Sequence, residues 1–144
     1  MDVEETLTTH LAGRHLAAVT RREYDWKFSF GDIAASGLSA ECPWRIIVGN
    51  RIAFSSSDDG HRFGLAAPLD GEKVARDLLG SRPIERISIR SDTGDMSLLF
   101  ADHVVLEVLN MSSGYEGWEI GVPGYYVVAT GGGELAIFAD KQGR

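Results

Sequence analysis

A hairpin of two strongly apolar arms lies within Asp95–Ile120 and restricts the possible folds more than any other segment. Its first arm is Met96–Phe100 and its second is Val104–Val108, and both are apolar at nearly every position rather than at alternate ones. Strands of this kind are usually covered on both faces, so we expect the hairpin to lie centrally in the fold. We expect His103 to take the left-handed conformation at the turn, which histidine tolerates better than most residues.

The size and composition of the chain are those of one ordinary globular domain. With 144 residues, of which 44% are hydrophobic and 24% charged, the chain is long enough to bury a substantial core. No apolar run reaches the roughly 18–20 residues that a membrane span needs, and the acidic N-terminal segment is unlike a signal peptide. A single cysteine, Cys42, excludes a disulfide within the chain. These features predict a single cytoplasmic domain over residues 1–144.

The net charge of the chain narrows the classes of partner that it suits. Acidic residues outnumber basic ones by 21 to 14, and the net charge is −7. Phosphate binding requires a concentrated basic surface, so this balance disfavours nucleic acid as a partner. An acidic protein is instead suited to a basic protein partner, because complementary charges steer the two together. The same charge is also typical of proteins for which it serves solubility alone.

Two short helices are indicated by apolar spacing and by the residues at their ends. Val3, Leu7 and Leu11 recur at helical intervals. A second helix is expected after Asp70, a favourable N-cap, and should end at Gly80. About ten strands account for most of the remainder: His15–Thr20, Trp26–Phe30, Ile33–Glu41, Trp44–Val48, Arg51–Ser55, Ile84–Ile89, the two arms of the hairpin, Gly117–Val122, Tyr125–Thr130 and Glu134–Ala139. This order predicts an α+β fold, mostly antiparallel β with two short helices.

The two halves of the chain are similar to each other in sequence. Three segments have counterparts at offsets of 68, 70 and 74 residues: Leu11–Val19 with Leu79–Ile87, Phe28–Asp32 with Leu98–Asp102, and Trp44–Ile46 with Trp118–Ile120. An internal duplication would give two helix-plus-sheet halves, 1–70 and 71–144, around a pseudo-twofold axis. The alternative is chance similarity, because apolar alternation in one β-rich half easily matches that in another.

No segment carries a pattern typical of catalysis or of a cofactor site. Asp58, Asp59 and His61 share a loop that could ligate a metal, but a solvated turn explains them better because transition-metal sites usually need more His or Cys ligands. The glycines at 131–133 lack the Lys-Ser/Thr pair of a phosphate-binding loop and fit a hairpin turn. Cys42 lies in a strand-like context away from any helix N-terminus, which favours a buried structural thiol over a nucleophile. The sequence therefore predicts no enzyme, no metal and no cofactor.

Aromatic and acidic residues gather in the segment after the hairpin. Tyr115 and Glu116 lie in a Ser- and Gly-rich loop, Met111–Gly117, and three more aromatic residues follow within a short distance. Tyrosine and tryptophan are common anchors of protein interfaces, and glutamates would suit a basic partner. The alternative is that Trp118 is a core residue and that the tyrosines close one end of a sheet. The predicted binding residues are Tyr115, Glu116, Trp118, Glu119 and Tyr125.

The chain resembles a family of small, mostly uncharacterised bacterial proteins over roughly Leu11–Phe138. The resemblance rests on DMSLLFADHVVLEVL at Asp95–Leu109, on the motif Tyr-Glu-x-Trp at Tyr115–Trp118, and on the pair Trp44-Arg45. Some members of the family lie beside polymorphic toxin genes and are taken to be immunity proteins. At His103 the chain departs from the family pattern, which has glycine at this turn. The resemblance implies a binding role without catalysis, and it supplies no catalytic residues to carry over.

These features predict a non-enzymatic protein-binding module. The resemblance implies an immunity-type protein that neutralises a toxin, in this case a basic one, by occluding it. The alternative is a ligand-binding or scaffold domain whose partner is another protein of the same cell. If the loop Met111–Gly117 is not the contact site, the polar loop Ser55–Gly64 is the next candidate.

Overall fold

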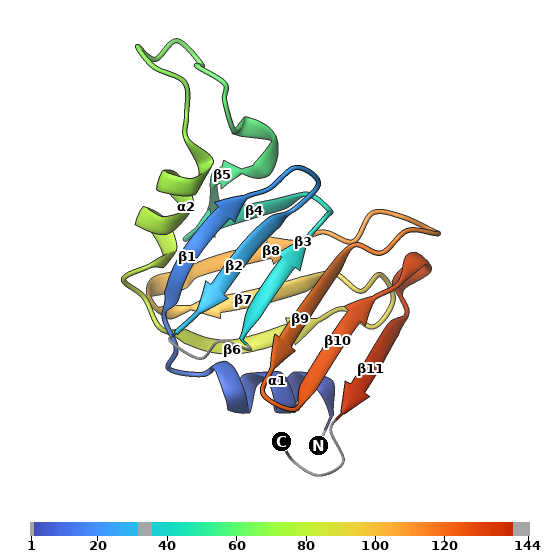
Figure 1. Ribbon diagram of the computed structural model, residues 1–144. Helices are drawn as coiled ribbons and strands as arrows, with labels where there is room; N and C mark the ends of the chain where they lie inside the picture. The colour runs from blue at the N-terminus through green and yellow to red at the C-terminus, as the bar shows by residue number, and fades with distance from the viewer. Residues whose placement is uncertain (1, 32–35, 140–144) are drawn as a thin grey trace.

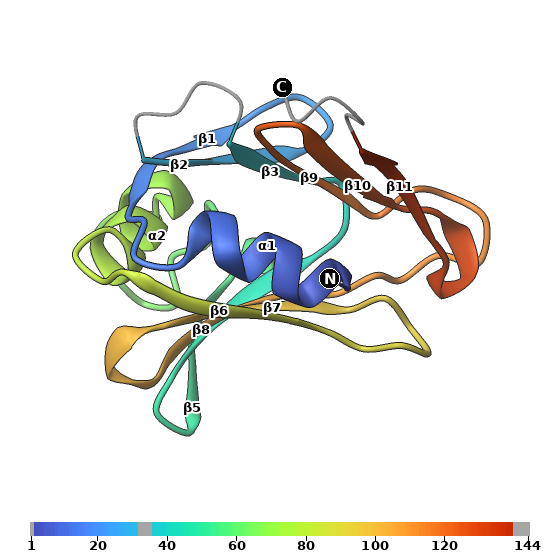
Figure 2. The ribbon, with the colours of Figure 1, turned by 90° about the horizontal axis from the view of Figure 1, so that it is seen from below.

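The computed structural model describes residues 2–31 and 36–139, which form two antiparallel sheets and two short helices (Figure 1). The α+β class predicted from the sequence is confirmed, with eleven strands in the described part of the chain. The sheets lie one above the other, and helix α1 (Val3–Leu11) occupies the space between them (Figure 2). The first part of the strand predicted at 33–41 lies outside the described residues; its described part is Gly37–Ala40.

The six-stranded sheet combines strands from both halves of the chain. In spatial order its strands are β1 (Leu16–Arg21), β2 (Trp26–Phe30), β3 (Gly37–Ala40), β9 (Trp118–Val122), β10 (Tyr125–Ala129) and β11 (Leu135–Ala139). Every neighbouring pair is antiparallel. The two halves meet where β3 pairs with β9, and there Ala40 lies opposite Trp118. Residues about eighty positions apart in the sequence are thus direct neighbours at this point.

The five-stranded sheet contains the apolar hairpin. Its strands in spatial order are β5 (Arg51–Ser55), β4 (Trp44–Val48), β8 (Val104–Val108), β7 (Met96–Phe100) and β6 (Ile84–Ile89). The halves meet again where β4 pairs with β8, and Trp44 lies opposite Val108. In β7, β8 and β9 buried side chains alternate with less buried ones, which is the expected pattern for sheets that share one core.

The hairpin β7–β8 is central in its sheet, as predicted, but only one of its faces is fully covered. Leu98 and Leu106 point inward and are completely buried. Leu99 and Val105 point outward and are half-buried, so the expectation that both faces are covered was wrong. His103 takes the predicted left-handed conformation, with φ of 60°, and the preceding Asp102 does so as well.

The two helices begin where the sequence predicted and pack against edge strands. The Asp2 carboxylate accepts from the N–H of Glu5 at the start of α1, and Asp70 accepts from Glu72 at the start of α2 (Gly71–Leu79). Such caps satisfy N–H groups that have no partner in the first turn. Helix α1 packs mainly on β6 and α2 mainly on β1, so each helix covers a strand of the other half. Among the described helices, none combines the length and hydropathy needed to cross a bilayer.

The two halves follow the same order of elements for most of their length. Each has a helix, then a three-stranded meander in one sheet, then a crossing to the other sheet, where a further hairpin follows. Matching side chains also make matching contacts: Glu4 of α1 accepts from the backbone N–H of Ile89, and Glu72 of α2 accepts from that of Arg21. Strand β11 has no counterpart in the five-stranded sheet. A common origin of the halves stays a prediction.

Candidate protein-binding site

The loop Met111–Gly117, here called the Tyr115 loop, connects β8 to β9 and is fastened where it begins. The backbone N–H of Asn110 donates to the Asp95 carboxylate at 2.9 Å, and its side-chain amide donates to the Thr93 carbonyl at 2.9 Å. Both partners belong to the turn between β6 and β7. Asn110, the residue before the loop, is therefore bound to the neighbouring β6–β7 hairpin as well as to its own strand.

The middle of the Tyr115 loop rests on the glycine turn at 131–133. The Ser112 hydroxyl accepts from the backbone N–H groups of Gly114 and Tyr115, at 3.1 and 2.8 Å, and this closes a tight turn. The Ser112 carbonyl in turn accepts from the N–H of Gly132 at 2.9 Å. Gly131 packs so closely on Gly114 that a Cβ atom there would stand 2.5 Å from its backbone. The glycine run is a hairpin turn, as predicted, and it is also the seat of the loop.

The end of the Tyr115 loop is held from two sides. The Gly117 carbonyl accepts from the N–H groups of Glu41 and Cys42, at 2.8 and 3.1 Å, in the connection between β3 and β4. The Gly117 N–H donates to the Ala129 carbonyl at 3.0 Å. Because both ends and the middle have backbone partners, the loop presents its side chains from a fixed frame.

Three large side chains of this loop face solvent. Tyr115 is 82% exposed, Met111 is 71% exposed, and Glu116 is also exposed. Two of the predicted binding residues, Tyr115 and Glu116, thus lie where a partner could reach them. Met111 was not predicted as a binding residue, because no feature of the sequence indicates that this methionine is exposed beside Tyr115.

Trp118 is a core residue, which corrects its prediction as a contact residue. Its side chain is 2% exposed, and its indole Nε1 donates to the Gly94 carbonyl at 2.8 Å. It is therefore enclosed, and the alternative considered from the sequence applies. Tyr125 is partly buried, packs against the core, and lies opposite Val122 at the far end of β9. Neither residue joins Tyr115 in one exposed patch.

Glu119 points to the outer face of the six-stranded sheet and forms an acidic–aromatic face with Tyr126 and Phe138. The Tyr126 hydroxyl donates to Glu119 Oε2 at 2.5 Å, and the Tyr126 and Phe138 rings are 6.0 Å apart. Burial, the hydrogen bond to Glu119 and the negative charge of Glu116 raise the pKa of Tyr126 to about 12. Glu119 lies two residues after Gly117, so this face begins directly where the Tyr115 loop ends.

A second exposed element, here called the arm, is the segment Gly60–Leu69 that projects between β5 and α2 (Figure 1). Its two sides are joined by backbone hydrogen bonds, from Gly60 to the Leu69 carbonyl and from Leu69 to the His61 carbonyl. Phe63 is 66% exposed, Leu65 is 54% exposed, and Phe63 has a φ of +45°, which is rare for a bulky residue. The sequence was interpreted here only as a polar loop.

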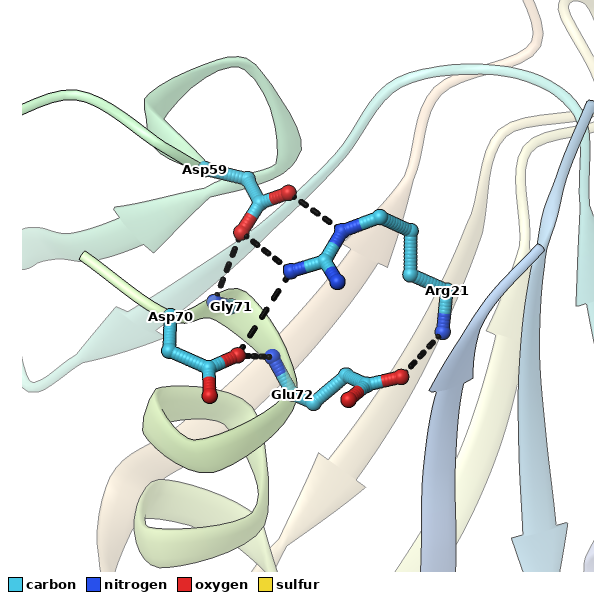
Figure 3. A network of polar contacts seen from close by, with 5 residues as sticks. All are labelled: Arg21, Asp59, Asp70, Gly71 and Glu72. Atoms are coloured by element: carbon cyan, nitrogen blue, oxygen red, sulfur yellow. Dashed lines mark hydrogen bonds and ion pairs between the residues drawn. The ribbon is translucent and has the colours of Figure 1, made fainter. Parts of the chain in front are cut away.

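Arg21 fastens the base of the arm to the six-stranded sheet (Figure 3). Its guanidinium donates twice to Asp59, at 2.5 and 2.8 Å, and lies 3.5 Å from Asp70. Asp59 also accepts from the N–H of Gly71 at 2.8 Å, and the backbone N–H of Arg21 donates to Glu72. Arg21 holds the pKa of Asp59 below its usual value. The carboxylate that could have served a metal is therefore engaged in an ion pair.

A hollow of about 460 Å³ lies beside the base of the arm. It is lined by the turn between β1 and β2, by the connection between β3 and β4, and by Ser56, Ser57 and Asp59. Tyr24 stands at this hollow with 81% exposure. Cys42 also lines it, and burial raises the pKa of its thiol to about 12, so the thiol is protonated at neutral pH. Within the described residues, no group of three or more His, Cys, Asp or Glu is placed to hold a metal ion.

Comparison with protein-family models, with curated proteins and with solved structures gave no match to this chain.

Proposed function

We propose that this chain is a protein-binding module of the immunity type, which neutralises a basic toxin by covering its working surface. The observation that carries the proposal is the 82% exposure of Tyr115 on a loop whose backbone is tied at both ends and in the middle. An exposed tyrosine in a fixed frame offers a large contact area with little conformational entropy to lose on binding.

The surroundings of Tyr115 favour a partner that is basic. Glu116 lies beside it, and Glu119, which accepts from the Tyr126 hydroxyl, lies two residues beyond the end of the loop. Glu23 and Glu41 are exposed near the hollow and have no ion-pair partner among the residues described. With a net charge of −7, the chain would attract a basic protein over distances near the Debye length and dock through this side.

The assignment to immunity proteins draws on the sequence resemblance, whose Tyr-Glu-x-Trp motif has its first two residues in the exposed loop. In this proposal Tyr115 and Glu116 contact the toxin, while Trp118 supports the loop from the core. Occlusion needs only complementary surfaces, so no catalytic group of the chain takes part. The alternative, a domain that binds another protein of the same cell, is favoured by the apolar side chains of the arm.

The test is a titration against the product of the neighbouring gene with the double variant Tyr115→Ala, Glu116→Lys. We expect binding to weaken by about 2 kcal/mol or more, roughly thirtyfold, as truncation of interface anchors typically does. The melting temperature should stay nearly unchanged, because both side chains lie in solvent. Ile52→Ala is the control, since Ile52 is 59% exposed on β5, at an edge of the other sheet and away from the proposed contact.

Normal binding by the double variant would place the contact elsewhere. In that case Phe63→Ala with Leu65→Ala decides whether the arm is the contact and the alternative function applies. Unfolding of the double variant would instead mean that Tyr115 stabilises the domain.

A further inference from the structure

Strand β11 is an edge strand whose outward backbone groups have no partner in the described part of the chain. The N–H of Thr130 donates to the Glu134 carbonyl, and this bond fixes which residues of β11 face β10. In an antiparallel pair the hydrogen-bonded residues alternate, so Ala136 and Phe138 face β10. The N–H and C=O groups of Leu135, Ile137 and Ala139 therefore point away from the sheet.

The edge strands β1 and β6, which begin the meander of each half, have outward N–H groups that bind side chains of a helix. The outward N–H of Arg21 in β1 donates to Glu72 of α2. In β6, the N–H groups of Ile87 and Ile89 donate to Thr8 and Glu4 of α1, at 3.0 and 2.6 Å. Proteins usually cover or charge their sheet edges to prevent association with other chains. Helix side chains do this for β1 and β6, whereas no hydrogen bond within residues 2–31 and 36–139 reaches the outer edge of β11.

The side chains of β11 also suit association. The strand Leu135–Ala139 carries no charge in a chain whose net charge is −7. Ile137 is 48% exposed and Phe138 is 59% exposed. An uncharged apolar edge with free backbone groups is a template for another strand.

We propose that β11 pairs antiparallel with β11 of a second copy of this chain, which would join two six-stranded sheets into one continuous sheet across a twofold axis. The twofold axis passes through Ile137, which lies opposite its own copy, and each outward-facing residue exchanges a pair of hydrogen bonds with the residue opposite. The sequence favours this partner sterically. In this register Leu135 faces Ala139 and Phe138 faces Ala136, so a large side chain meets a small one at each unlike pair.

The dependence on salt distinguishes this pairing from binding to a basic protein. Two copies of an acidic chain repel each other, so added salt should strengthen their association by screening. Attraction to a basic partner would instead weaken with salt. The proposal does not depend on the proposed function, although a dimer would carry the Tyr115 loop twice and could bind a multivalent partner more tightly.

The test measures mass by light scattering over a dilution series, for the full chain and for Ile137→Pro. The N–H of Ile137 points away from β10, so proline there removes a bond between copies and none within the chain, and edge strands tolerate such a proline. We expect the unmodified chain to reach twice its 15.7 kDa, and Ile137→Pro to remain at the single-chain mass with an unchanged circular dichroism spectrum.

Two further variants make the result decisive. Ile137→Lys keeps the N–H but places a charge at the axis, and it should also abolish dimers. Ile52→Lys makes the same change at a 59% exposed position of β5, the other uncovered edge candidate, and should leave the dimer intact. The proposal is overturned if the unmodified chain stays single at about 1 mM, where even a millimolar dimer would be populated. A dimer that survives both changes at Ile137, or one lost in Ile52→Lys, would also overturn it.

Discussion

Replacing Gly131 by alanine tests the contact on which the Tyr115 loop rests. A Cβ atom at this position would stand 2.5 Å from Cα and C of Gly114 and 2.6 Å from its nitrogen, closer than real Cβ atoms approach other atoms. These neighbours are backbone atoms, so no side chain can rotate away and the loop itself must move. Gly131 has an ordinary φ, unlike Gly132, so the backbone conformation alone does not oppose alanine.

Two opposing effects set the expected magnitude. Gly-to-Ala at a compatible backbone position stabilises a protein by about 0.4–1 kcal/mol, because the unfolded chain loses freedom. Overpacking of a tight contact costs about 1–3 kcal/mol. Since the contact involves three backbone atoms, we expect the second effect to dominate and the free energy of unfolding to fall by about 1–2 kcal/mol.

The assay is urea denaturation followed by tryptophan fluorescence, with Trp118 near the affected loop as one reporter. Gly114→Ala is the matched control, because a Cβ there meets nothing within 4 Å and its φ is ordinary. We expect that control to be neutral or slightly stabilising. If Gly131→Ala is as stable as the unmodified chain, the glycine turn does not seat the loop, and the fixed frame assumed for Tyr115 is refuted.

Two further changes test the core and the base of the arm. Leu98→Ala removes a fully buried side chain of β7 and should cost about 2–5 kcal/mol in a urea melt, so that a loss below about 1 kcal/mol would contradict a central hairpin. Arg21→Gln should speed hydrogen exchange at the Leu69 amide, while Lys73→Gln, which breaks an exposed pair on α2, should not. Because the folded pKa of Asp59 is lowered, its contribution to stability is present at neutral pH and is lost as the pH falls through that pKa. Arg21→Gln should therefore flatten the acid limb of the stability curve below the ordinary pKa of an aspartate.

The elements of the fold were predictable because local rules govern them. Asp2 and Asp70 are caps that sequence alone can identify or suggest, and the apolar spacing of α1 and α2 indicates which face is buried. The alternation in Trp26–Phe30 and the turn at His103 have the same local character. The pairing of β3 with β9 was not predictable, because register between distant strands depends on the whole core.

The candidate site was only partly predictable, and Trp118 shows why. Trp118, Ile120 and Val122 alternate with Glu119 and Gly121, so the pattern already places the tryptophan on the apolar face of its strand. Composition favoured an interface anchor, but alternation was the better guide. Glu119 was predicted as a binding residue; the same alternation puts it on the outer face, and a contact there stays a prediction.

The exposed aromatic residues of the arm and of β11 were missed for a different reason. Phe63 projects because the arm closes on itself through its own backbone bonds, which no spacing rule reveals. Phe138 lies in an alternating strand, and only the sheet order shows that this strand is at an edge. Phe63 and Phe138 are exposed because no other segment of the described chain packs over them, and this depends on the whole fold rather than on local sequence.

The Tyr115 loop makes one of the two matching crossings between the sheets longer than the other. In each half the chain crosses from one sheet to the other, between β3 and β4 and between β8 and β9. The strands before the crossings end at Ala40 and Val108, an offset of 68 residues. The strands after the crossings begin at Trp44 and Trp118, an offset of 74 residues. The extra residues all fall between β8 and β9. These offsets describe how the strands of the two halves align, and they do not depend on whether the halves share an ancestor.

The exposed features therefore lie outside the matched framework. The Tyr115 loop lengthens one crossing between the sheets, the arm follows β5, and β11 follows the corresponding hairpin of the second half. The fully buried leucines Leu98 and Leu106 lie instead in β7 and β8, which correspond to β2 and β3 of the first half. Segments that the core does not require yet are held by specific backbone bonds are the ones on which binding can act. This is the structural reason to direct the mutations at Tyr115 and Ile137 before any residue of the sheets' interior.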